Sequence, residues 1–140
     1  MQDDFGKLVL RLTVGALLLL HGVHKMLTGI APIEAMVVAH HLPQALAYGV
    51  YAGEIIAPVM VMLGIFARIG AGLIVVNMVM AVVLAGLPDI AHLGPSGGYA
   101  LELEAFYLFG AVAIAFLGAG RLSLAGGRWN CSKARTSGRT

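Results

Sequence analysis

The sequence predicts an all-α integral membrane protein, a bundle of four transmembrane helices with both termini in the cytoplasm. Of its 140 residues, 59% are hydrophobic and only 11% are charged, and the mean hydropathy is +0.90. A soluble domain carries about 25% charged residues, so this chain lacks the usual polar coat. The apolar residues also gather into four long runs, and the basic residues gather on one side of those runs. Together these observations predict a multi-pass membrane protein.

Each apolar run is long enough to cross a bilayer. The runs cover residues 8–27, 45–66, 69–87 and 99–117. A hydrocarbon core of about 30 Å needs about 20 helical residues at 1.5 Å per residue. The first run starts with basic residues, as a signal peptide does, but it ends with His24 and Lys25 and no Ala-x-Ala site follows it directly. We therefore expect the first run to be retained as a span.

Basic residues set the predicted orientation, because cytoplasmic loops are enriched in Lys and Arg. Of the nine lysines and arginines, only Lys25 falls on the opposite side. Lys7 and Arg11 precede or begin the first run, and Arg68 lies between the second and third. The others follow the fourth run: Arg121, Arg128, Lys133, Arg135 and Arg139. This pattern predicts an N-in, C-in protein.

The segments between the runs complete the predicted domain organisation. Residues 28–44 are too apolar for a solvated loop and too short to span, and Pro32 suits a first helical turn, so we expect a short interfacial helix there. Residues 88–98 are a turn-rich connector. The expected division is a four-helix transmembrane domain, 1–120, followed by a basic, mobile cytoplasmic tail, 121–140.

Several ionisable residues fall inside or at the ends of the apolar runs, where each costs about 2.5–3.5 kcal/mol to insert. In the predicted topology His21 and Lys25 lie one helical turn apart in the outer third of the first span. Glu54 lies near the middle of the second span, and Glu102 and Glu104 lie in the first turns of the fourth. Pairing His21 or Lys25 with one of the carboxylates would relieve much of the penalty. We predict a polar cluster in the outer half, as a ligand site or as structural glue, and assign no catalytic residue.

Other polar and small residues are expected to be structural. Arg11 either faces the bundle or extends to the headgroups, and His24 lies near the end of the first span. Asn77, deep in the third run, is expected to bridge to another helix. Close helix packing is indicated by small residues at four-residue spacing along the second run: Gly49, Gly53 and Ala57.

The sequence indicates no intrinsic metal or cofactor. Its single cysteine, Cys131, excludes an intrachain disulfide, which weighs against enzymes of the vitamin K epoxide reductase type that need paired thiols. The histidines form no HExxH or CxxCH motif. Only the first span carries histidines, so a haem held between two facing spans lacks its second ligand. We expect no metal site.

With these residues in place, the chain resembles the DoxX family of small bacterial membrane proteins over about residues 8–124. The matching pieces are Leu8–Met26 with its HGxxK, Leu42-Pro43, Gly53–Arg68 and Gly97–Leu124. The family's closing motif usually continues with an Asp after Ser-Leu, where this chain has Ala125. The family commonly has one Glu early in the fourth span, which corresponds to Glu102 or Glu104.

The resemblance implies a four-helix bundle in the bacterial cytoplasmic (inner) membrane. It also implies a link to membrane redox complexes, since the family is named for a subunit of a thiosulfate:quinone oxidoreductase. It therefore implies a subunit of, or an accessory to, a quinone- or sulfur-linked oxidoreductase complex, with quinone as the cofactor. The sequence has no flavin, haem or iron–sulfur motif, so a redox partner is expected.

The alternative is a non-catalytic assembly or structural accessory subunit, and the sequence does not decide whether the chain is an enzyme. A transporter is less favoured, because no pair of interrupted spans is visible. The expected partners are membrane lipid and other membrane subunits or further copies of this chain, not nucleic acid.

Overall fold

The structure, a computed structural model, describes residues 1–95 and 97–125. These residues are helical apart from their connections and one isolated β-bridge between Leu93 and Tyr99. The predicted tail beyond Ala125, which includes Trp129 and Cys131, lies outside the described residues.

Helix α1 (Gln2–Thr28) contains the whole first apolar run. It begins before the predicted start at residue 8, because the polar residues ahead of the run continue the helix. Asp3 and Asp4 lie in its first turn and Lys25 in its last, which is the favourable arrangement with the helix dipole. Gly29 ends the helix with φ 87°, a conformation that residues with a Cβ rarely adopt.

The second apolar run forms one helix over Gln44–Leu63, assembled from segments of different winding. These segments are η1 (Gln44–Tyr48), α3 (Gly49–Tyr51), the π-helical turn η2 (Ala52–Ile56) and α4 (Ala57–Leu63). The helix ends at Gly64, which has φ 72°, so it stops three residues before the predicted end at 66.

The third run forms a helix over Ala67–Asp89 from α5 (Ala67–Ala81), the π-helical turn η3 (Val82–Gly86) and η4 (Leu87–Asp89). Pro88 has no N–H to donate to the carbonyl four residues earlier, that of Leu84. The His40 ring lies where this missing donor would act, with its Nε2 3.2 Å from the Leu84 oxygen. His40 directly follows α2 (Ala31–Ala39), the short helix that the sequence predicted, with Pro32 in its first turn.

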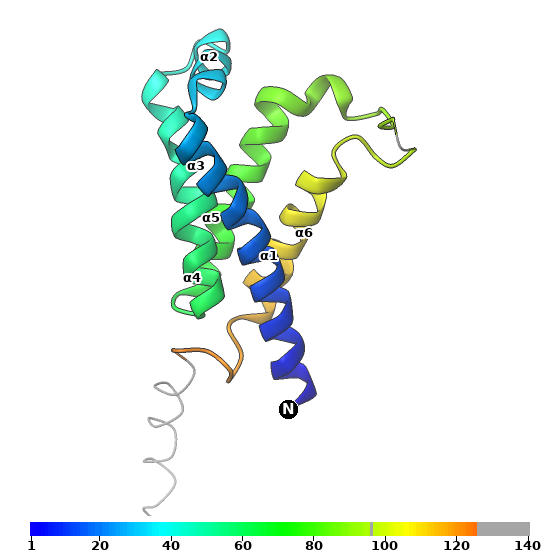
Figure 1. Cartoon of the computed structure of the whole chain (residues 1–140). Coiled ribbons are helices and arrows are strands. Elements are labelled where there is room, and N and C mark those ends of the chain that lie inside the picture. The colour runs from blue at the N-terminus through cyan, green and yellow to red at the C-terminus, as the bar shows by residue number, and fades with distance from the viewer. Residues whose placement is uncertain (96, 126–140) are drawn as a thin grey trace, which may run out of the picture.

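Helix α6 (Glu102–Leu117) packs against α5 and α1 and completes the bundle. Figure 1 shows that the N-terminus and the end of the described chain lie at one end of the bundle, and that α2 and the 90–100 loop lie at the other. By length and composition, the described residues contain three helices able to cross a membrane: Gln2–Thr28, Gln44–Leu63 and Ala67–Asp89. The fold is thus all-helical, with several apolar helices.

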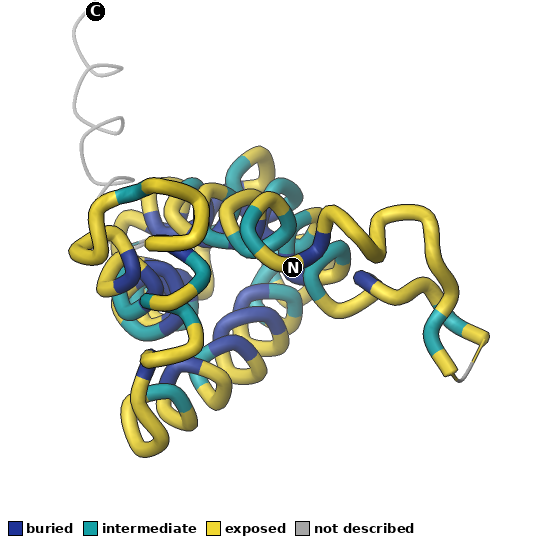
Figure 2. Tube along the Cα trace, turned by 90° about the horizontal axis from the view of Figure 1, so that it is seen from above, coloured by how far each residue is buried: buried dark blue, intermediate teal, exposed yellow. Residues whose placement is uncertain are grey.

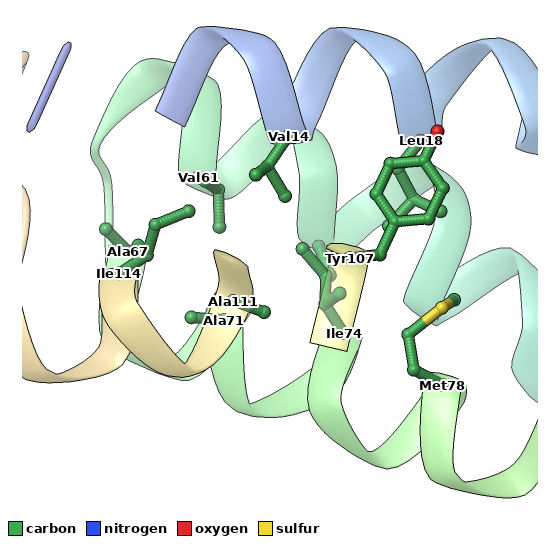
Figure 3. Packing of buried hydrophobic residues seen from close by; sticks show 11 residues of the cluster. Val14, Leu18, Val61, Ala67, Ala71, Ile74, Met78, Tyr107, Ala111 and Ile114 are labelled. Atoms are coloured by element: carbon green, nitrogen blue, oxygen red, sulfur yellow. The ribbon is translucent and has the colours of Figure 1, made fainter. Parts of the chain in front are cut away.

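The core of the bundle is apolar and is drawn from all the long helices. Val14 and Leu18 of α1 meet Ile74 of α5 and Tyr107 of α6, all nearly inaccessible (Figure 3). Exposed residues occupy the outside of the helices (Figure 2), and many of them are large and apolar, such as Phe116 with 81% exposure. A smaller apolar cluster packs α2 against η1 and α3, at the start of the Gln44–Leu63 helix. An apolar outside around an apolar core is what a lipid environment requires.

Candidate functional site

A buried ion pair joins the first two long helices. Lys25 Nζ of α1 lies 2.5 Å from Glu54 Oε1 of η2. The Glu54 side chain is only 5% exposed, whereas that of Lys25 is 29% exposed. The sequence left several cation–carboxylate pairings open, and the structure contains this one. Because a lone charge in an apolar bundle is costly, loss of either partner would destabilise the contact between α1 and η2.

Asn77 brings the third helix to the same carboxylate. Its Nδ2 donates to Glu54 Oε1 over 3.2 Å, so this oxygen receives hydrogen bonds from two helices. Gly53 makes the approach possible, because a Cβ at this position would overlap the Asn77 side chain. Asn77 is therefore the bridge to another helix that its position predicted.

The second carboxylate oxygen of Glu54 has no such partners. Glu54 Oε2 is buried, and within the described part of the chain no donor lies within hydrogen-bonding distance. An ionised carboxylate has only acceptor sites, so this oxygen is free to accept a proton or a hydrogen bond. Unsatisfied buried polar atoms are uncommon in native proteins and call for an explanation.

The backbone around Glu54 is shaped by a proline and a glycine. Pro58 cannot donate to the Glu54 carbonyl, and the π-helical turn η2 ends just before it, with Ala57 N–H bonded to the Ala52 carbonyl. π-Turns inside α-helices are frequent at functional sites. The freed Glu54 carbonyl faces Gly22 of α1, where a Cβ would collide with it. Gly22 therefore lets α1 approach close enough for Lys25 to reach Glu54.

Residues of α1 and of the Gln44–Leu63 helix form an apolar groove. It has a volume of about 350 Å³ and is lined by Met26, Tyr51, Ile55 and Ile56. Met26 directly follows Lys25, and Ile55 directly follows Glu54. The groove thus offers an apolar surface at the level of the buried carboxylate.

His21 lies apart from the carboxylate, on the exposed side of α1. Its Nδ1 is 3.1 Å from the Leu17 carbonyl oxygen. Its ring meets that of Tyr107 edge-on, with the ring centroids 5.8 Å apart. Sequence reasoning missed Tyr107, which is buried and points from α6 toward α1 (Figure 3). The sequence did hold one signal for Tyr107: it lies three residues after Glu104, on the same face of a helix as that predicted site residue.

The remaining members of the predicted cluster are dispersed. Glu102 is exposed at the start of α6 and Glu104 is partly buried, and neither forms an ion pair with a described residue. His24 is exposed, and its carbonyl accepts a hydrogen bond from Thr28 Oγ1. The structure therefore brings together Lys25, Glu54 and Asn77. Within the described ranges, no three His, Cys, Asp or Glu side chains are placed to hold a metal ion.

Arg11 is buried at the opposite end of the bundle and is 1% exposed. Its guanidinium donates to the carbonyls of Ala119 and Leu122, the latter over 3.0 Å, and lies 3.4 Å from that of Met62. Arg11 therefore faces the bundle and satisfies carbonyls at or just beyond the C-terminal ends of α4 and α6, where a cation is favourable.

The first residues of the expected tail lie against this end of the bundle. Arg121 N donates to Asp4 Oδ1 over 2.9 Å, and Leu124 N donates to the Leu63 carbonyl over 3.1 Å. The packed chain thus continues past the predicted domain boundary at 120, because backbone groups after α6 find partners on α1 and at the end of α4.

Comparison with known protein families matches residues 6–87 to the DoxX model. The matched range contains Lys25, Glu54 and Asn77, and it ends before Tyr107 of α6. Neither the search of curated proteins nor the search of solved structures found a match.

Proposed function

Because the chain belongs to the DoxX family of membrane proteins, we propose that it is an integral subunit of, or an accessory to, a membrane redox complex that acts on quinone or a sulfur compound. The observation that carries the proposal is Glu54, a carboxylate buried in an apolar bundle with one oxygen unpartnered. In this proposal the chain binds the ligand and handles its protons, and a partner chain carries the electrons.

The proposed arrangement in the membrane has four spans, with both termini in the cytoplasm of a bacterial cell. Helix α6 contributes the fourth span in this arrangement. Its 16 residues cover about 24 Å at 1.5 Å per residue, which is shorter than a hydrocarbon core of about 30 Å, and local thinning of the bilayer accommodates a short span. Support comes from the N-terminus and the end of the described chain, which lie at the same end of the bundle (Figure 1), and from Lys7, Arg68 and Arg121 at that end. This orientation puts the Lys25–Glu54 pair in the outer half of the bilayer.

The depth of Glu54 along its helix supports a functional role for this residue. The residue lies ten positions into the Gln44–Leu63 helix, about 15 Å along it. An ionisable group at such a depth is expensive and by default marks a ligand or proton site. A quinone-type headgroup suits this environment, because its ring is apolar and its two oxygens gain protons on reduction and lose them on oxidation.

The second candidate is a structural accessory subunit, and the other oxygen of Glu54 favours it. Oε1 receives hydrogen bonds from Lys25 of α1 and Asn77 of α5, so the carboxylate ties three helices together. In that case the polar residues fix the bundle alone, and the protein serves the complex by contact.

Purification in a mild detergent separates the two candidates. The protein is examined for co-purifying chains, ultraviolet–visible absorbance and extractable quinone, in wild-type form, as Glu54→Gln and as Glu102→Gln. Glu102→Gln is the matched control, because it makes the same chemical change at an exposed carboxylate. We expect bound quinone in the wild type and the control, and at least a tenfold loss in folded Glu54→Gln. Partner chains without any bound small molecule would favour the structural candidate.

A further inference from the structure

The unpartnered oxygen of Glu54 restricts the kind of ligand atom that the site accepts. We infer that the site binds the reduced, hydroxyl-bearing form of a quinone-type ligand, a quinol, in preference to the oxidised quinone. The inference rests on the proposed function and adds to it the redox state of the bound ligand.

The argument starts from the donors around Glu54. Lys25 and the Asn77 amide both donate to Oε1, so Oε1 is supplied from two helices. Oε2 is buried and receives no hydrogen bond from the described residues. A carboxylate paired with an ammonium is acceptor-only at its free oxygen. A ligand that binds at Oε2 must therefore offer a hydrogen-bond donor.

The two redox forms of a quinone differ in just this property. A quinol presents hydroxyl groups that donate, and a hydrogen bond from O–H to a carboxylate is among the stronger ones. A quinone presents carbonyl oxygens that only accept hydrogen bonds. If it bound here, its carbonyl oxygen would face Glu54 Oε2, and the two acceptors would repel each other. Sites built around a buried polar group discriminate strongly against analogues that lack the matching group.

The same two helices also provide a place for the ring. The apolar groove of about 350 Å³ is lined by Met26, Tyr51, Ile55 and Ile56, from the same two helices as the pair, and suits an aromatic ring or an isoprenoid tail. Oε2 is closed in this structure, whereas Lys25 is 29% exposed. Lysine has a flexible four-carbon stem, so we expect a ligand to reach the carboxylate by displacing Lys25, the more exposed member of the pair.

The test is an equilibrium titration of the full-length protein in mild detergent under anaerobic conditions. The probes are a short-chain benzoquinone, its quinol, and the dimethyl ether of that quinol, which keeps the ring and removes both O–H donors. We expect the quinol to bind about tenfold more tightly than the quinone or more, and the ether to bind no better than the quinone. Glu54→Gln should bring the quinol-to-quinone ratio close to one, and Glu102→Gln should leave it unchanged.

The outcomes distinguish this inference from the proposed function. Equal affinities, or tighter binding of the quinone or the ether, would overturn the preference for a donor while leaving a quinone site in place. Absence of binding for all three probes would overturn both. The wild-type comparison decides the matter even if Glu54→Gln does not fold.

Discussion

Gly22→Ala is the sharpest single perturbation of the contact that holds the site together. Gly22 is buried in α1 against the backbone of η2. An added Cβ would overlap the Glu54 carbonyl oxygen and lie 2.7 Å from Ile55 Cγ1. The carbonyl belongs to the backbone and cannot turn away as a side chain could. Helix α1 must therefore move away from η2 at the level of Lys25 and Glu54.

The expected cost follows from two opposing effects. Overpacking a well-filled contact costs about 1–3 kcal/mol. Alanine returns up to about 1 kcal/mol through its higher helix propensity. We expect a net loss of about 1–2 kcal/mol in the free energy of unfolding, since the clash involves backbone. Gly6→Ala in the same helix is the matched control, because its Cβ would meet nothing within 4 Å. The control should be neutral or slightly stabilising.

The measurement is reversible unfolding in mixed micelles of sodium dodecyl sulfate and a mild detergent, followed by circular dichroism. Gly22→Ala should unfold at a lower fraction of dodecyl sulfate than both the wild type and Gly6→Ala. If Gly22→Ala and Gly6→Ala proved equally stable, the close approach of α1 to η2 would be refuted as the basis of the Lys25–Glu54 contact.

Two further predictions concern the other end of the bundle and the topology. Arg11→Met should lower the free energy of unfolding in the same micelles by more than about 2 kcal/mol, because it leaves the carbonyls that Arg11 satisfies without a donor. Wild-type stability of this variant would show that these hydrogen bonds do not stabilise the bundle. In a Cys131→Ser background, a membrane-impermeant thiol reagent added to intact cells should label Leu93→Cys and leave Gln2→Cys and Leu124→Cys unlabelled. Labelling of Leu124→Cys with Leu93→Cys protected would reverse the proposed orientation.

Much of the fold followed from the sequence, because long apolar runs in a membrane have few alternatives to a helix. The short helix α2 was also predictable, since residues 28–44 were apolar but too short to span. The ends of helices were harder to place. The Gln44–Leu63 helix stops before the predicted 66 because Gly64 adopts a left-handed conformation, which hydropathy does not encode.

The contacts around Glu54 were predictable only in part. The insertion cost of Glu54 pointed to a cationic partner, but the choice of Lys25 over His21 depends on the approach that Gly22 allows. The π-turn at Glu54 and the free Oε2 are three-dimensional facts without a simple sequence signal. Tyr107 was missed because an aromatic residue in a span looks like ordinary core. A ligand role for any of these residues stays a prediction.

The most direct test of the central claim, that the Glu54 carboxylate acts on a ligand and does not only tie helices, is the charge-swapped double variant Lys25→Glu/Glu54→Lys. The swap keeps an ion pair between α1 and η2 and moves the carboxylate to the other helix. Stability in mixed micelles and extractable quinone are measured for the wild type, both single variants and the double variant. We expect the double variant to be more stable than either single variant while its bound quinone remains lost. Recovery of quinone together with stability would contradict the claim, because the position of the carboxylate would then not matter.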